Sequence, residues 1–269
     1  MRTIFPTATS TDDAGDTDVP DSPLTVLWEP PLVVATLNRP GVHNAVDGAL
    51  MGALETFLDD LERRGDIRVV ILTGAGGETF CAGGDLRWFA TLTSREACLA
   101  MSRRMQAILA RLYGGPRPVI AAINGQALGG GCEILTACHL RLAATHARFA
   151  FRQAPNGILT GWGGGGRLFA QLRRGDALRM VLSGDPIYAQ EALRIGLVDK
   201  LVHAEELMTA ARELGVTIAG HSRDAVAAFL EMSRRSVGDD PASLAAWETE
   251  TFGNLWMGPE FQAVLERFR

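Results

Sequence analysis

Two glycine-rich segments of the chain could place backbone amides around one negatively charged oxygen. One contains Gly83 and Gly84, and the other contains Gly129, Gly130 and Gly131. Each follows an apolar stretch and precedes a stretch with helical character, so N–H groups at these turns would point outward and suit an anion. If the two turns converge, two N–H donors form an oxyanion hole. The alternative is that these glycines only permit tight turns.

Glu133 is a carboxylate close to the second of these segments. It follows Gly130 by three residues, just inside a predicted helix, where the helix N-terminus favours negative charge. A carboxylate at this place could move a proton within one helical turn of the proposed hole. The alternative is an ordinary acidic residue in the first turn of a helix.

Other motifs that often carry chemistry are absent from the sequence. No Lys-Ser or Lys-Thr follows the glycine segments, which excludes a Walker-type phosphate loop. The glycine run 161–166 follows no convincing strand, so we do not interpret it as a dinucleotide fingerprint. The five histidines and four cysteines lack metal-ligand spacing, and no Gly-x-Ser-x-Gly motif occurs. Neither a metal centre nor a serine hydrolase is expected.

Hydrophobic patterning predicts the elements that would position these residues. Strands are expected at 24–28, 32–37, 69–73, 119–123, 140–144 and 149–151. Helices are expected at 47–64, 94–112 and 132–138, the first two capped by Asp47 and Ser94. Three successive passes of strand, glycine loop and helix indicate an α/β core of stacked units.

The chain after Gly166 has a different character, because only helices are predicted there. They are expected at 167–172, 175–183, 189–194, 205–219, 222–235 and 241–256. The last of them carry large apolar residues, including Phe229, Phe252 and Trp256, so this helical tail should dock on its own domain or on another subunit.

Composition excludes several broad classes of protein. The 269 residues are 47% apolar and 21% charged, as in folded globular proteins. The net charge of −5 is the opposite of the positive charge that nucleic-acid-binding proteins use to bind phosphates. No apolar run approaches the ~20 residues that span a bilayer. Residues 1–22 read as a disordered acidic tail rather than a signal peptide, so we expect a cytoplasmic protein with neither nucleic-acid nor membrane partners.

Several motifs in order resemble those of the crotonase (enoyl-CoA hydratase/isomerase) superfamily. They are Leu37-Asn38-Arg39-Pro40, Asn44-Ala45, residues 80–86, residues 127–133 and residues 183–198. The resemblance implies an α/β fold of the ClpP/crotonase-like kind, a spiral of ββα units with a C-terminal α-helical region. We therefore expect a spiral core for acyl-CoA binding and catalysis at 23–204 and a helical oligomerisation region at 205–269. A homotrimer or a dimer of trimers is implied.

The resemblance also implies an acyl-CoA thioester substrate whose enolate is stabilised in the oxyanion hole. The backbone N–H groups of Gly84 and Gly130 would hold the thioester oxygen. Ala82, Asp85 and Leu86 would lie along the CoA-binding segment. CoA enters as part of the substrate, and neither a metal nor a redox cofactor is expected.

Two further positions carry over from the family. Glu133 matches the first catalytic glutamate of the hydratases, whereas Gln153 stands where they carry the second. An amide exchanges no proton near neutral pH, and hydration needs an activated water and a proton delivered to the α-carbon. Efficient hydration is therefore disfavoured. Trp162 is expected either to line the acyl pocket or to pack at a helix start.

Three roles remain open, and decarboxylation of a short malonyl-type CoA thioester is slightly favoured. Residues 158–168 resemble the ethylmalonyl-CoA/methylmalonyl-CoA decarboxylase branch, and loss of CO2 generates an enolate without a base. Arg152 could pair with the malonyl carboxylate, although strand alternation would turn Arg152 and Gln153 to opposite faces. The alternatives are hydration or isomerisation of a 2- or 3-enoyl-CoA and a non-catalytic CoA-binding paralogue.

Overall fold

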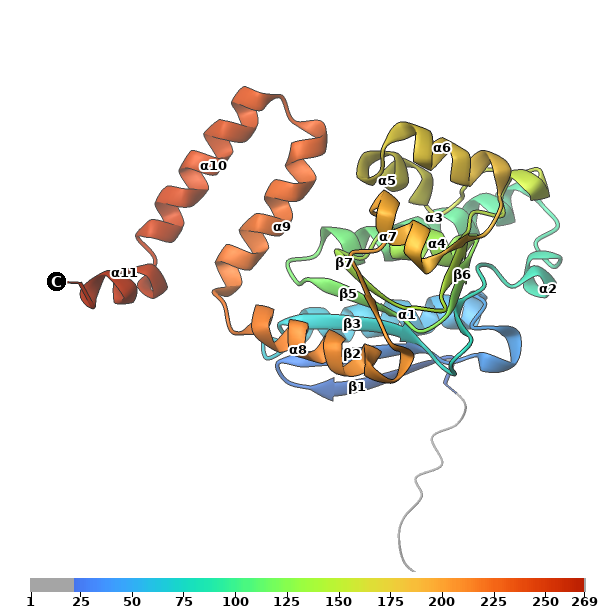
Figure 1. Ribbon diagram of the computed structural model, residues 1–269, viewed down its shortest axis with the longest axis horizontal. Helices are drawn as coiled ribbons and strands as arrows, with labels where there is room; N and C mark the ends of the chain where they lie inside the picture. Colours follow the sequence, from blue (N-terminus) through green and yellow to red (C-terminus); the bar gives the residue numbers. More distant parts are fainter. Residues whose placement is uncertain (1–21, 269) are drawn as a thin grey trace, which may run out of the picture.

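Two β-sheets form the centre of the protein, whose computed structural model describes residues 22–268 (Figure 1). The larger sheet has the order β1-β2-β3-β5-β7-β10 and the smaller has the order β4-β6-β8-β9. The strands of the larger sheet are β1 (Leu24–Glu29), β2 (Leu32–Leu37), β3 (Val69–Gly74), β5 (Val119–Ile123), β7 (Leu140–Ala144) and β10 (Lys200–Val202). Those of the smaller sheet are β4 (Thr79–Cys81), β6 (Gln126–Leu128), β8 (Arg148–Ala150) and β9 (Ile187–Tyr188). The predicted acidic tail, apart from residue 22, lies outside the described residues.

Eleven helices accompany these sheets in the described part of the chain. They are α1 (Gly48–Arg63), α2 (Leu86–Phe89), α3 (Arg95–Gly114), α4 (Gly130–Leu135), α5 (Gly164–Gln171), α6 (Arg174–Ser183), α7 (Ala189–Ile195), α8 (Leu207–Ala219), α9 (Arg223–Gly238), α10 (Pro241–Trp256) and α11 (Pro259–Glu266). The predicted caps of α1 and α3 are confirmed, since Asp47 accepts the amide of Leu50 and Ser94 accepts that of Ala97. The mixed α/β class is confirmed as well.

Both faces of the larger sheet are buried, as the alternation of side chains along β3 shows. Val70 and Leu72 join the hydrophobic cluster that contains the apolar faces of α1 and α3. Val69 and Ile71 point the other way and join a second cluster with α8. A continuous apolar run is expected for a parallel strand covered on both faces, which explains why this strand was readily predicted.

The smaller sheet brings the chemically interesting loops to one edge. β4 pairs parallel with β6, and β6 pairs parallel with β8, so the carboxyl ends of all three strands lie on the same side. Gly84 follows β4, Gly130 and Glu133 follow β6, and Gln153 follows β8. Parallel pairing therefore gathers residues that are up to 69 positions apart in the sequence.

The prediction that strands stop after Gly166 was wrong. β9 pairs antiparallel with β8, and β10 pairs parallel with β7. Both are only two or three residues long and exist through backbone pairing with distant strands, which hydrophobic periodicity cannot detect. For the same reason β4 and β6 were missed inside segments expected to be glycine loops.

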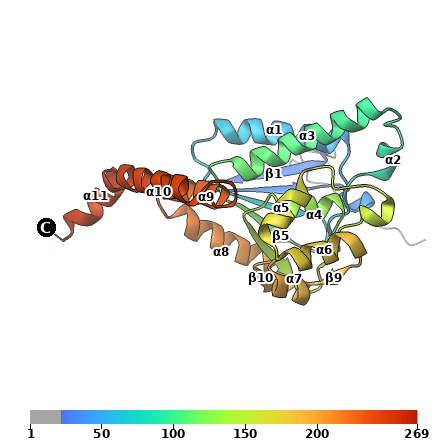
Figure 2. The ribbon, with the colours of Figure 1, turned by 90° about the horizontal axis from the view of Figure 1, so that it is seen from above.

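The C-terminal helices divide into a packed part and an extended part. α8 covers the larger sheet, whereas α9, α10 and α11 extend away from the body as an arm (Figures 1 and 2). Along this arm Phe229 and Phe252 are 68% and 60% exposed. The expected domain division at residue 205 stays a prediction. Among the described residues, no helix has the length and apolar character to cross a membrane.

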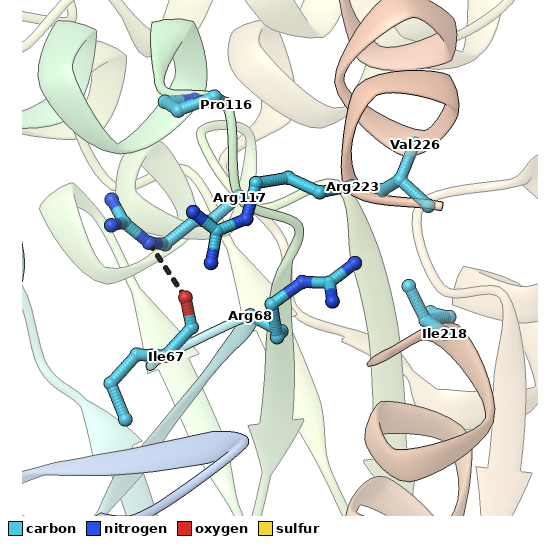
Figure 3. A pocket seen from close by; sticks show the side chains of 7 residues that line it. All are labelled: Ile67, Arg68, Pro116, Arg117, Ile218, Arg223 and Val226. Carbon is cyan, nitrogen blue, oxygen red and sulfur yellow. Dashed lines mark hydrogen bonds between the residues drawn. The ribbon is translucent and has the colours of Figure 1, made fainter. Parts of the chain in front are cut away.

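Arginine side chains tie the base of this arm to the body around a small pocket (Figure 3). Arg68 of the body donates to the carbonyl oxygen of His221 over 2.7 Å, and Arg223 of α9 donates to that of Gly65. Within the body, Arg117 donates to the carbonyl oxygen of Ile67 over 3.0 Å. Arg223, the first residue of α9, lies close to Arg117, and the like charge contributes to lowering the pKa of Arg117 after the larger effect of burial. These contacts fix where the arm leaves the body.

Candidate active site

The two glycine segments converge in the structure, as the proposed oxyanion hole requires. A Cβ atom on Gly83 would lie 2.8 Å from the backbone nitrogen of Gly130, and Gly83 has a φ of +94°, which L side chains rarely adopt. The loop after β4 therefore touches the loop after β6. Among the loop hydrogen bonds of residues 22–268, neither the Gly84 nor the Gly130 amide acts as a donor.

An aromatic ring lies against each of the two candidate donor residues. A Cβ on Gly84 would come within 2.1 Å of the Phe89 ring, and a Cβ on Gly130 would come within 2.1 Å of the Trp162 ring. Any side chain at either position would collide with these rings. Glycine is thus required at both places by close approach, in addition to any role of the amides.

The carboxylate of Glu133 is buried and held by four hydrogen bonds from described residues. Oε2 accepts the backbone amides of Trp162 at 2.7 Å and Gly164 at 3.0 Å. Oε1 accepts the amide of Gly161 at 3.2 Å and the side-chain Nε2 of Gln153 at 3.0 Å. The glycine run 161–166 therefore wraps the carboxylate of α4.

Burial raises the pKa of Glu133 above its ordinary value. The backbone amides of Gly164, Trp162 and Gly161 and the amide of Gln153 act in the opposite direction, because they stabilise the ionised form, but desolvation prevails. A carboxylate with a raised pKa next to unbonded backbone amides is suited to taking up and returning a proton.

Gln153 contacts Glu133 directly and is itself almost fully buried, with 8% of its surface exposed. Its Nε2 donates to the carboxylate, whereas its Oε1 accepts no hydrogen bond from any residue that the structure describes. A buried carbonyl oxygen without a partner is costly, so it marks a place where a polar group of a ligand or a water would bind favourably.

The structure places the expected CoA-binding segment on and beside the start of α2. Ala82 lies in the loop after β4, and Leu86 is 72% exposed. Asp85 caps α2, since its carboxylate accepts the amides of Arg87 and Trp88, and it also forms an ion pair with Arg39 at 3.1 Å. The part played by these residues in substrate binding stays a prediction.

Arg152 does not share the pocket with Gln153. Its side chain is exposed and donates to the carbonyl oxygen of Gly184 over 2.9 Å, whereas Gln153 is buried and donates to Glu133. β8 ends at Ala150, so both residues lie beyond the strand, and the contact with Gly184 rather than strand alternation keeps Arg152 away from Glu133.

Sequence reasoning missed two of the four residues that hold Glu133 in place, Gly161 and Gly164. It treated 161–166 as a glycine run without a clear role, although Gly161 and Gly164 donate two of the four hydrogen bonds. A Cβ on Gly164 would come within 2.5 Å of the Glu133 side chain, so glycine is needed there. The only sequence signal for this contact was the glycine run itself, and Glu133, the residue it binds, lies about 30 residues away in the sequence.

Among the described residues, no cluster of His, Cys, Asp and Glu could hold a metal ion.

Comparison with known proteins agrees with this arrangement. Residues 30–268 match the enoyl-CoA hydratase/isomerase family. The chain is 36% identical over 240 residues to a short-chain-enoyl-CoA hydratase of Clostridium acetobutylicum, covering 88% of this chain and 90% of that protein. It is 32% identical over 225 residues to a crotonyl-CoA hydratase of Syntrophomonas wolfei, covering 84% and 86%. The crystal structure of an enoyl-CoA hydratase from Bacillus anthracis superposes with a TM-score of 0.87 at 32% identity, covering 91% and 95%.

The fold and these similarities define a crotonase-fold enzyme that acts on acyl-CoA thioesters. The chain belongs to the enoyl-CoA hydratase/isomerase family.

Proposed function

We propose that this enzyme hydrates a 2-enoyl-CoA thioester with Glu133 as its single proton-transferring carboxylate. The observation that carries the proposal is the pairing of Glu133 with Gln153, whose Oε1 is buried without a partner among the described residues. This pair offers a carboxylate and a carbonyl oxygen to the two hydrogens of one water. The hydratase names of two relatives point in the same direction.

The reaction follows from these groups. The thioester oxygen accepts hydrogen bonds from the amides of Gly84 and Gly130, which stabilise negative charge on that oxygen. The water oxygen bonds to Cβ of the substrate while Glu133 takes one of its protons, and the Cα–Cβ double bond becomes an enolate. Glu133 then returns this proton to Cα. One water thus supplies both added groups, and the carboxylate is restored.

Glu133 must release one hydrogen bond before it can act as a base. A carboxylate has about four acceptor positions, and all four are engaged. Three of the donors are backbone amides fixed by the 161–164 segment, whereas the fourth is the side chain of Gln153. Rotation of Gln153 is the least costly way to free Oε1, and the same rotation presents its unpartnered oxygen to the incoming water.

Decarboxylation of a malonyl-type thioester has less support. It requires a group that binds the departing carboxylate, and Arg152, the candidate for this role, turns away to the carbonyl oxygen of Gly184. The buried neighbour of Glu133 is an amide whose free atom is an acceptor, which does not attract a carboxylate.

The proposal extends to cofactors and assembly. Proton transfer by Glu133 involves no change of oxidation state, so CoA would enter only as part of the substrate. The exposed apolar residues of α9–α11 support assembly into a trimer or a dimer of trimers through the arm. Light scattering after size-exclusion chromatography tests this assembly, and a monomer would contradict it.

Mass spectrometry of the products from a small substrate panel tests the reaction. The panel contains crotonyl-CoA, a 3-enoyl-CoA, methylmalonyl-CoA and ethylmalonyl-CoA. We expect the mass of one water to be added to crotonyl-CoA, at a rate well above that of CO2 loss from either malonyl thioester. Faster decarboxylation or faster double-bond migration would reject the proposal in favour of that reaction.

A further inference from the structure

Trp162 contributes to the site in two separate ways. Its backbone amide donates to Oε2 of Glu133 over 2.7 Å, while its indole ring lies against Gly130, where a Cβ would come within 2.1 Å of the ring. The same residue therefore touches both the proton-transferring carboxylate and one of the two candidate oxyanion donors.

The indole ring is fixed in place by contacts with α3. Its Nε1 lies 3.4 Å from Sδ of Met101, and only 3% of the residue is exposed. The preceding carbonyl oxygen, that of Gly161, accepts hydrogen bonds from Ser102 at 2.5 Å and Gln106 at 2.9 Å. The ring packs against α3 and the preceding peptide is bonded to the same helix, so the ring cannot move aside without breaking contacts.

Phe89 lies against the other donor residue, Gly84, but it differs from Trp162 in two respects. It is partly exposed, and it belongs to the four-residue helix α2. In the proposed reaction Glu133 takes a proton from the water that bonds to Cβ and delivers it to Cα, so the acyl chain must lie on the side of Glu133. That is the side of Trp162.

We infer that Trp162 closes the acyl pocket and restricts the enzyme to short acyl groups. This inference rests on the proposed binding of the thioester at Gly84 and Gly130. A thioester bound there brings its Cα and Cβ next to Glu133, and each further methylene then meets the buried face of the indole. A pocket wall of this kind discriminates by roughly tenfold or more for each methylene that does not fit.

Binding of saturated acyl-CoA thioesters tests the inference independently of the reaction, because these ligands cannot be hydrated. Calorimetry would give the Kd of butyryl-CoA, hexanoyl-CoA and octanoyl-CoA for the wild type and for Trp162→Ala, Trp162→Phe and Trp28→Ala. Trp28 is a partly buried tryptophan that packs on Phe57, remote from Glu133, and serves as the matched control.

The ratio of the octanoyl-CoA Kd to the butyryl-CoA Kd is the decisive quantity. We expect a ratio of about ten or more in the wild type and in Trp28→Ala, and a fall of about tenfold or more in Trp162→Ala, with Trp162→Phe between them. The same ratio in the wild type and in folded Trp162→Ala would overturn the inference. If Trp162→Ala does not fold, an unchanged ratio in Trp162→Phe overturns it.

The two proposals can fail separately. In one outcome the wild type does not hydrate crotonyl-CoA, but Trp162→Ala still loses the discrimination between butyryl-CoA and octanoyl-CoA. This result would reject the hydratase reaction and retain the role of Trp162. In the other outcome the wild type hydrates crotonyl-CoA, but the ratio of the two Kd values is the same whatever residue stands at 162. This result would retain the hydratase reaction and reject the role of Trp162.

Discussion

The side-chain amide of Gln153 donates to the carboxylate of Glu133 over 3.0 Å, while the oxygen of the same amide is buried without a partner among the described residues. A neutral amide stabilises the ionised carboxylate, which a second carboxylate in its place would not do. The site therefore has one titrating carboxyl group, whose properties depend on burial and on the hydrogen bonds it accepts.

The pH dependence of hydration should report the raised pKa of Glu133. In the proposed reaction Glu133 acts as a base, so its protonation would remove activity, and kcat/KM for crotonyl-CoA should fall as the pH is lowered through the pKa of Glu133 in the folded enzyme. Burial places that pKa above the ordinary value of 4.5. We call the fall of kcat/KM at low pH the acidic limb of the pH profile. A midpoint of this acidic limb at or below pH 4.5 would contradict the raised pKa of Glu133.

Gln153→Glu should move that acidic limb to higher pH. Two carboxyl groups at hydrogen-bond distance cannot both ionise easily, so the pKa of Glu133 should rise further. A second proton-transferring group should also increase hydration about tenfold or more at pH values above the limb. Gln153→Met, which has neither donor nor acceptor of comparable strength, should reduce hydration. An acidic limb that stays in place in Gln153→Glu would show that the two side chains are not in contact.

Gly164→Ala should reduce activity because its methyl group would come within 2.5 Å of the Glu133 side chain and displace the carboxylate. We expect a loss of at least about tenfold in kcat, with destabilisation of roughly 1–3 kcal/mol from overpacking. Gly166→Ala is the matched control in the same helix, because its Cβ would meet no described heavy atom within 4 Å. The control should gain about 0.5–1 kcal/mol in free energy of unfolding. Equal activity of the two variants would refute the role assigned to Gly164.

His139 should make the folded protein sensitive to acid. Its Nδ1 accepts the amide of Val119 at 3.0 Å, its Nε2 lies 3.1 Å from the carbonyl oxygen of Tyr113, and burial lowers its pKa from 6.5 to about 4. Because the unfolded chain takes up the proton first, this contribution to stability is complete above pH 6.5 and is lost as the pH falls toward 4.

Urea unfolding measures this effect directly. The free energy of unfolding should be lower by roughly 2 kcal/mol at about pH 5 than at about pH 7.5 because of His139 alone. In His139→Gln, whose side chain takes up no proton, the difference between the two pH values should shrink by a similar amount. An unchanged difference would assign the acid sensitivity to other groups.

The sequence was sufficient for the elements with strong local signals. The buried strand 69–73, the caps Asp47 and Ser94 and the glycine segments were all identified from patterns within a few residues. The pairing of β4, β6 and β8 and the contact between Glu133 and residues 161–164 were not. They depend on backbone amides and short strands that meet only after folding, and such contacts leave little trace in hydrophobic periodicity.

The position of Gln153 illustrates the same limit. Resemblance to the family placed it at the site, and its amide chemistry argued against efficient hydration. That argument considered the residue alone. The structure adds the bond to Glu133 and the unpartnered oxygen, and on these two observations we base the proposal that the amide orients a water beside a single base.

Hydration of crotonyl-CoA in heavy-oxygen water, compared between the wild type and Glu133→Gln, tests the central claim most directly. The account predicts one heavy oxygen on Cβ of the product in the wild type, and a loss of about 100-fold or more in rate for a folded Glu133→Gln protein. No uptake of heavy oxygen by the wild type, or an equal rate in the variant, would contradict hydration by a single carboxylate at this site.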